Sequence, residues 1–301
     1  EIGVRLVGSE MCIRDRYRSL NMKKKWFLLP MSLIMLAGCD YSHKEAQHGL
    51  FYTVFVKPMD DLLHVLGHAF NENYGLAIIV IVFILRLILM PLMCIQVKNI
   101  HVIRGKTDVV KPEINKIQEK IKEAQSPEER RAANKLLMKK YNEYGINPFK
   151  NLIGTFPILI QIPILLGLYT SIKYPTSGGI TQHPHFLWFN LMHTDIIMTI
   201  IAAVMYFIQP LVNSIHYPKN ERRSYYVMMV LSPLFITYAS LHSASALSLY
   251  WAISATFLII QMHFAHSHYA KVGKIEGEKL RQRIEIKRQT TSETSSDTSN
   301  H

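Results

Sequence analysis

The stretch from Tyr74 to Gln96 constrains the fold more than any other, because it is apolar, long enough to cross a membrane, and interrupted near its middle by Arg86. About 20 helical residues cover the ~30 Å hydrocarbon core of a bilayer. A guanidinium at that depth costs at least about 2.5–3.5 kcal/mol, so it normally faces a protein interior or a water-filled cavity. Arg86 is therefore the first candidate functional residue. The alternative is a structural ion pair within a helix bundle.

The charge pattern indicates a polytopic membrane protein. The chain has 301 residues, is 49% hydrophobic and carries a formal charge of +12, which in a soluble protein would favour nucleic-acid binding. Here the apolar residues form separate blocks and the Lys and Arg residues lie between them, so the charge is first a topology signal and no DNA partner is expected. We predict five transmembrane segments, at 75–95, 152–172, 195–215, 225–241 and 246–265.

The N-terminal region predicts a lipoprotein. Residues 22–38 combine a basic start with a short apolar run, as signal peptides do, so we expect translation to begin at Met22 and exclude 1–21 from the fold as a non-native leader. The run ends in Leu36-Ala37-Gly38-Cys39, which resembles a bacterial lipobox and predicts lipidation of Cys39. Ordinary signal peptidase cleavage is the alternative. The three cysteines suggest no disulfide framework.

The remaining segments alternate in charge in a way that predicts an outside N-terminus and a cytoplasmic C-terminus. Residues 39–74 are expected outside, with an amphipathic interfacial helix broken at Pro58; the alternative is a plain spacer. Residues 96–150 are strongly basic and predict a mobile cytoplasmic hairpin of two helices, Pro112 to Ala124 and Pro127 to Tyr144, the second with Ser126 as its N-cap. The loops and tail complete the topology: 173–194 outside, 216–224 cytoplasmic, and 266–301 a basic cytoplasmic tail with a disordered end from Gln289.

No Asp or Glu lies inside the five apolar blocks, since Asp195 stands at an edge. This argues against an ion pair for Arg86 and against a proton- or sodium-coupled transporter, whose relays use such residues. The partners within reach of Arg86 are neutral. They are Gln161, Tyr206, Gln209, Tyr238, Ser248, Trp251 and Thr256.

Three other groups of residues have a weaker claim to function. His263, His266 and His268 could bind a metal, although an interfacial polar cluster fits them better. Ser243, Ser245 and His242 could suggest a serine hydrolase, but no nucleophile elbow is visible. The basic loop and tail could bind acidic lipid or ribosomal RNA, or could simply be solvated.

The residues from about Tyr41 to Lys274 resemble the YidC/OxaA family of membrane protein insertases, in its Gram-positive lipoprotein branch. The matching motifs are Arg86 within Leu85 to Leu92, the basic hairpin, Asn147-Pro148, Phe156 to Pro163, Phe207-Ile208-Gln209 and Leu247 to Trp251. Two features depart from the family pattern. The turn His242 to Ala246 is altered, and Ser254 or Ala255 replaces the usual asparagine after the Tyr-Trp pair.

The resemblance implies an all-α membrane protein, a five-helix insertase bundle with a hydrophilic groove open to the cytoplasm and to lipid. Arg86 would supply the groove's charge, with Gln209, Trp251 and Gln161 beside it. Met205, Phe207 and Phe257 would form a hydrophobic slide for the substrate.

The expected location is the bacterial cell membrane. The expected partners are nascent membrane proteins and membrane lipids, with the ribosome and the Sec translocon as further candidates. No cofactor is expected beyond a diacylglycerol and an acyl chain on Cys39, and no enzymatic activity. A polytopic secondary transporter, a membrane enzyme and a purely structural lipoprotein are the alternatives.

Overall fold

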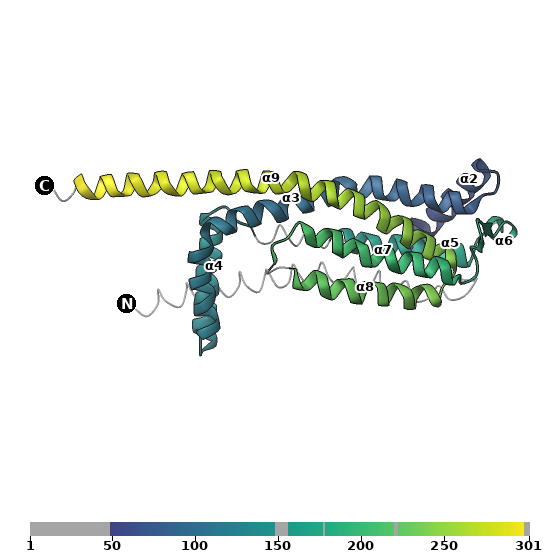
Figure 1. The fold of residues 1–301 in the computed structure, drawn as a ribbon, viewed down its shortest axis with the longest axis horizontal. Helices are drawn as coiled ribbons and strands as arrows, with labels where there is room; N and C mark the ends of the chain where they lie inside the picture. Colours follow the sequence, from purple (N-terminus) through teal and green to yellow (C-terminus); the bar gives the residue numbers. More distant parts are fainter. Residues whose placement is uncertain (1–48, 148–155, 177, 220–221, 298–301) are drawn as a thin grey trace.

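The computed structural model describes residues 49–147, 156–176, 178–219 and 222–297, and within these ranges the chain is almost entirely helical. Two helices much longer than a membrane span, α3 and α9, lie side by side along the molecule (Figure 1). The predicted all-α fold is confirmed for the described residues; their only strands are β1 (His185–Phe186) and β2 (Phe189–Asn190), two residues each and antiparallel.

Helix α3 (Tyr74–Glu123) is a single helix of 50 residues, which is about 75 Å at 1.5 Å per residue. The sequence predicted a membrane span followed by a separate helix from Pro112, and that division is wrong. Pro91 and Pro112 both lie inside the helix. An interior proline normally costs about 3 kcal/mol, and the packing of α3 along α9 offsets that cost here.

Helix α9 (Ser245–Asp297) likewise continues for 53 residues through the predicted last span and most of the tail. The predicted disordered end from Gln289 is wrong as far as Asp297, and the last four residues lie outside the described part. No proline follows Ser245, so nothing in the sequence forces the helix to stop.

Three glycines hold α3 and α9 in close contact beyond the apolar part of the bundle. A Cβ added at Gly105 would lie 1.9 Å from the carbonyl oxygen of Gly273, and one at Gly277 would lie 2.5 Å from that of Gly105. Gly273 itself faces the carbonyl oxygen of His101, at 2.3 Å from an added Cβ. Residues four apart share a helix face, so Gly273 and Gly277 form one backbone-to-backbone contact surface.

Helix α4 (Pro127–Glu143) crosses the end of this helix pair (Figure 1). The predicted N-cap is confirmed, because Ser126 accepts a hydrogen bond from the Glu129 main-chain nitrogen at 3.1 Å. No residue of α4 is buried, as expected of a hairpin that buries little. An ion pair of 2.8 Å between Lys140, near the end of α4, and Glu113 nevertheless ties α4 to α3. The hydrogen bond from Lys140 lowers the pKa of the Glu113 carboxyl.

Three further helices complete the apolar part, and these are α5 (Phe156–Lys173), α7 (Ile196–Ile215) and α8 (Arg223–Leu241). Helix α7 packs between α8 and α9. Four described helices, α3, α7, α8 and α9, are long and apolar enough to cross a membrane, whereas the apolar part of α5 from Leu159 is shorter. The fifth span therefore stays a prediction.

At the end of the molecule opposite α4, the chain forms a compact cap. The sequence predicted a break at Pro58, and that prediction is wrong. The π-helical turn η2 (Tyr52–Val56) continues directly into α2 (Lys57–Ala69). The wider π turn accommodates the proline at the start of α2. Helix α2 packs on α3 and α5, and the short helix α6 (Gly179–Gln182) lies beside it.

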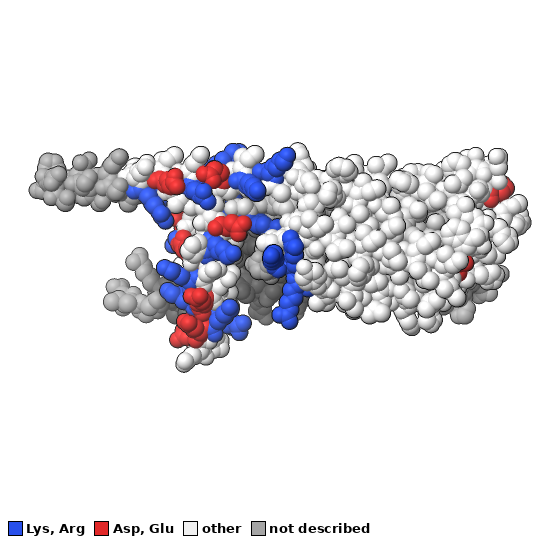
Figure 2. Space-filling model, in the orientation of Figure 1, with Lys and Arg blue, Asp and Glu red and all other residues white. Residues whose placement is uncertain are grey.

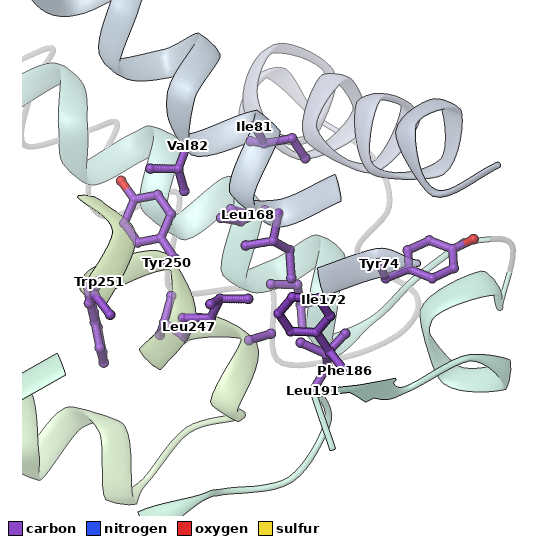
Figure 3. Packing of buried hydrophobic residues seen from close by; sticks show 14 of the residues in the cluster. Tyr74, Ile81, Val82, Leu168, Ile172, Phe186, Leu191, Leu247, Tyr250 and Trp251 are labelled. Carbon is purple, nitrogen blue, oxygen red and sulfur yellow. The ribbon is translucent and has the colours of Figure 1, made fainter. Parts of the chain in front are cut away.

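The main core lies between this cap and the middle of the bundle (Figure 3). It is built from α2, α3, α5, the β1–β2 turn, α7 and the start of α9, with Tyr74, Ile78, Ile81, Leu168 and Leu191 fully buried. Charge lies elsewhere. Figure 2 shows Lys and Arg gathered at the end that carries α4, which we term the charged end, and few charges on the rest of the visible surface.

We expect Gly105→Ala to destabilise the packing of α3 on α9 by about 1–3 kcal/mol, because the added methyl meets main-chain atoms that cannot turn away. Limited proteolysis of the charged end in detergent measures this. Ser267→Thr, which adds one carbon at an exposed position of α9, is the control. Alanine favours a helix over glycine by about 1 kcal/mol, so without the close contact the variant would be more resistant than wild type, and that result would contradict the close contact.

Candidate functional site

Arg86 lies roughly 18 Å along α3 from Tyr74, near the middle of a membrane-sized apolar layer. It is buried, with 8% of its surface exposed. Its Nε donates a hydrogen bond to Ser254 Oγ of α9 at 2.9 Å, and its Nη2 donates to the same oxygen. The guanidinium is thus fixed to the neighbouring long helix by a single hydroxyl.

The surroundings of Arg86 leave its charge without a counter-ion. Among the described residues no carboxylate pairs with it, and the side chains that interact with it electrostatically are Tyr206 and Tyr250, both neutral phenols. A guanidinium has five N–H donors, and one serine oxygen satisfies only part of them. A cation held in this way retains the capacity to receive an anionic group.

Ser254 was not among the partners that the sequence indicated for Arg86. It lies about 14 Å along α9 from Ser245, and since α3 and α9 start at the same end of the molecule, its depth is close to that of Arg86 (Figure 1). Thr256, two residues further along α9, satisfies the same depth criterion. Only the rotation of α9 against α3 selects Ser254.

Tyr250 connects a second predicted residue to this pair. It is buried one helical turn before Ser254, on the same face of α9. Its hydroxyl accepts a hydrogen bond from Gln161 Nε2 of α5. The structure therefore brings Gln161 to within one helical turn of the residue that holds Arg86.

Gln209 and Trp251 are not bonded to Arg86 within the described residues. Gln209 is half-buried on α7, one turn beyond Tyr206 and so on the same helix face. Trp251 is 6% exposed and belongs to the main core. Figure 3 shows Tyr250 and Trp251 projecting from different sides of α9.

The three residues predicted to form a slide are not joined to one another in the described contacts. Phe257 packs edge-on against Phe83 of α3, with ring centroids 5.7 Å apart. Met205 is half-buried on α7 and Phe207 is exposed there. Cys39 lies outside the described residues, so its lipidation stays a prediction.

The hydroxyl–imidazole arrangement of a hydrolase is not found at the turn between α8 and α9. Ser245 donates to the carbonyl oxygen of Asn190 at 2.6 Å. His242 Nδ1 donates to the carbonyl oxygen of Tyr238 at 2.8 Å. Both side chains bond main-chain atoms and close the turn.

Four histidines meet where α3, α7 and α9 leave the apolar part, and we term them the histidine cluster: His101, His216, His263 and His266. His101 Nε2 lies 2.9 Å from His266 Nδ1, and His216 Nε2 lies 3.3 Å from His263 Nδ1. The rings of His216 and His266 are stacked. Among the described residues no group of three or more His, Cys, Asp or Glu could hold a metal ion, which favours the polar cluster over a metal site.

Burial disfavours the charged form of three of these histidines. Together with the nearby Arg104 guanidinium and neighbouring histidines, it lowers the pKa of His101 to about 4 and that of His266 to about 3. Burial also lowers the pKa of His216. Arg104 lies over the ring of Tyr217, 4.3 Å from its centroid, and Tyr217 contacts both His101 and His266.

These features define a polytopic helical membrane protein whose apolar part encloses a buried arginine with neutral partners. Residues 65–272 match the family model of the 60Kd inner membrane protein. The chain is also similar to three staphylococcal proteins. Membrane protein insertase YidC 1 of Staphylococcus epidermidis is 64% identical over 265 residues, which is 88% of this chain and 95% of that protein.

Two other relatives are less similar but cover nearly as much. Membrane protein insertase YidC 2 of the same strain is 52% identical, and membrane protein insertase YidC of Staphylococcus aureus 51% identical, each over 85% of this chain and 89% of its own length. The chain belongs to the YidC family of 60Kd inner membrane proteins.

We expect acidification to destabilise the protein through the histidine cluster. The histidine pKa is about 6.5 in an unfolded chain and lower in the folded one, so between about pH 6.5 and pH 4 the unfolded state binds more protons and the free energy of unfolding falls. The midpoint of thermal unfolding in detergent should therefore drop from about pH 7.5 to about pH 5. This drop should be smaller in the double variant His101→Gln, His266→Gln.

His268→Gln is the matched control for that experiment, because His268 is exposed on the same helix. It should retain the wild-type pH dependence. If the double variant also retains it, the cluster does not set the acid sensitivity.

Proposed function

We propose that this chain is a membrane protein insertase in which Arg86 attracts polar or acidic segments of nascent membrane proteins into the bilayer. The observation that carries the proposal is the buried guanidinium of Arg86, held by Ser254 and faced by neutral phenols. Relatives that share half to two-thirds of its residues are named as insertases, which supports the same role for this chain. No comparison supports a secondary transporter.

The mechanism needs binding and not covalent chemistry. Arg86, Gln209, Gln161 and Trp251 would line a hydrophilic groove between the spans. An acidic N-terminal segment of the substrate would exchange its hydration for the Arg86 donors, in the charge-assisted bidentate geometry that guanidinium and carboxylate share. The membrane potential adds about 2.3 kcal/mol per elementary charge for each 100 mV crossed.

The apolar part of the substrate would leave the groove into lipid. Met205, Phe207 and Phe257 would contact the substrate helix on this route, and Phe83 joins them through its ring contact with Phe257. Each buried CH₂ group of the substrate contributes about 0.8 kcal/mol. Lipid partitioning of the substrate thus supplies the driving force, without nucleotide hydrolysis.

The charged end is proposed to face the cytoplasm, by the positive-inside rule. The cap formed by η2, α2 and α6 would then lie outside, with the N-terminus anchored through acyl chains on Cys39. The basic surfaces of α4 and the outer half of α9 are candidate contacts for lipid headgroups, the ribosome or the Sec translocon. Each of these partners remains a proposal.

We expect Arg86→Ala to abolish rescue of an insertase-depleted bacterium at matched expression, while Arg86→Lys retains it, because the site requires a positive charge. For a substrate with an acidic N-terminus, insertion should fall about tenfold, the effect of losing one interaction of about 1.4 kcal/mol. Protease protection of the substrate's translocated segment measures insertion directly.

Arg104→Ala is the control, since it removes another α3 arginine at the charged end without touching the proposed groove. Full rescue by Arg86→Ala would remove Arg86 from the mechanism. Failure of the wild-type chain itself to rescue would count against the insertase function in that host.

A further inference from the structure

Helix α5 is divided into two parts by burial. None of the residues 159–166 is buried, whereas Gly167, Leu168, Ser171 and Ile172 are. Pro163 lies inside the helix within the unburied part. A proline removes one helical hydrogen bond and is the usual site of a kink, so the helix has a bending point between its two parts.

The buried part of α5 is fixed to the cap. A Cβ added at Gly167 would lie 2.6 Å from the carbonyl oxygen of Phe55, so the backbones of α5 and η2 are in direct contact. Leu168 and Ile172 belong to the main core. Beyond the helix, Thr176 donates a hydrogen bond to the buried carboxylate of Asp60 in α2.

The unburied part is held differently. The described contacts of α5 are chiefly with η2 and α2 and, more sparsely, with α3. The polar tie in its unburied part is the hydrogen bond from Gln161 Nε2 to the Tyr250 hydroxyl. Tyr250 lies one helical turn before Ser254, which accepts the hydrogen bonds of Arg86, on the same face of α9.

We propose that residues 159–162 form a gate that bends at Pro163 and that the hydrogen bond between Gln161 and Tyr250, which we term the latch, holds closed. This deepens the proposed function, on which it rests for the identity of the substrate that the gate admits.

In this arrangement the gate opens when the bond between Gln161 and the Tyr250 hydroxyl breaks. The buried half of α5 stays with the cap throughout, so opening requires no movement of the long helices.

Hydrogen exchange of the full chain in lipid nanodiscs, read by mass spectrometry, tests the latch. Gln161→Leu and Tyr250→Phe should each speed exchange of amides in 159–162 about tenfold, as loss of one hydrogen bond allows, and leave 167–173 unchanged. Tyr206→Phe removes another phenol near Arg86, one that takes no part in the hydrogen bond with Gln161. This variant should exchange like wild type. Equal acceleration of both halves of α5, or none in 159–162, would overturn the latch.

These measurements use no substrate, so the latch can fail while rescue by the wild-type chain succeeds, or hold while rescue fails.

Discussion

The structure depends on one costly interaction, the burial of the Arg86 guanidinium in an apolar helix bundle. An ion pair would neutralise the charge, but the described residues offer Arg86 only the hydroxyl of Ser254 and the nearby phenols of Tyr206 and Tyr250. Such an arrangement is less favourable for the resting protein than a carboxylate partner would be, and it keeps a cation ready for an incoming anion. Stability is given up at this position, as the binding role that we propose for Arg86 requires.

The helices that carry this pair are held by contacts elsewhere. Arg86 and Ser254 belong to α3 and α9, and the register of these helices is set beyond the apolar layer by Gly105, Gly273 and Gly277 and by the histidine cluster. The glycines allow backbone contact, and the neutral imidazoles supply hydrogen bonds where the helices leave the apolar part. The position of Arg86 opposite Ser254 is therefore fixed from the charged end as well as from the core.

Sequence patterns predicted what depends on local chemistry. The apolar blocks, the Ser126 cap and the isolation of Arg86 from acidic residues were all readable, because each follows from residue type and spacing along one segment. The predicted breaks at Pro58 and between the first span and Pro112 were wrong, since a proline is a local signal that tertiary packing can override. The disordered end was overestimated for a related reason, as composition alone does not stop a helix that has no breaker.

The sequence by itself determined that this is a helical membrane protein with an uncompensated arginine at mid-depth, because hydrophobicity and charge act on each segment independently. Only the tertiary structure decided which side chain holds that arginine, which half of α5 is anchored, and that His101 pairs with His266. Those contacts join residues more than a hundred positions apart in the chain for Arg86 and His101 alike. They depend on the rotation and register of one helix against another. Glycine contacts and core packing set that rotation and register, and no single segment encodes them.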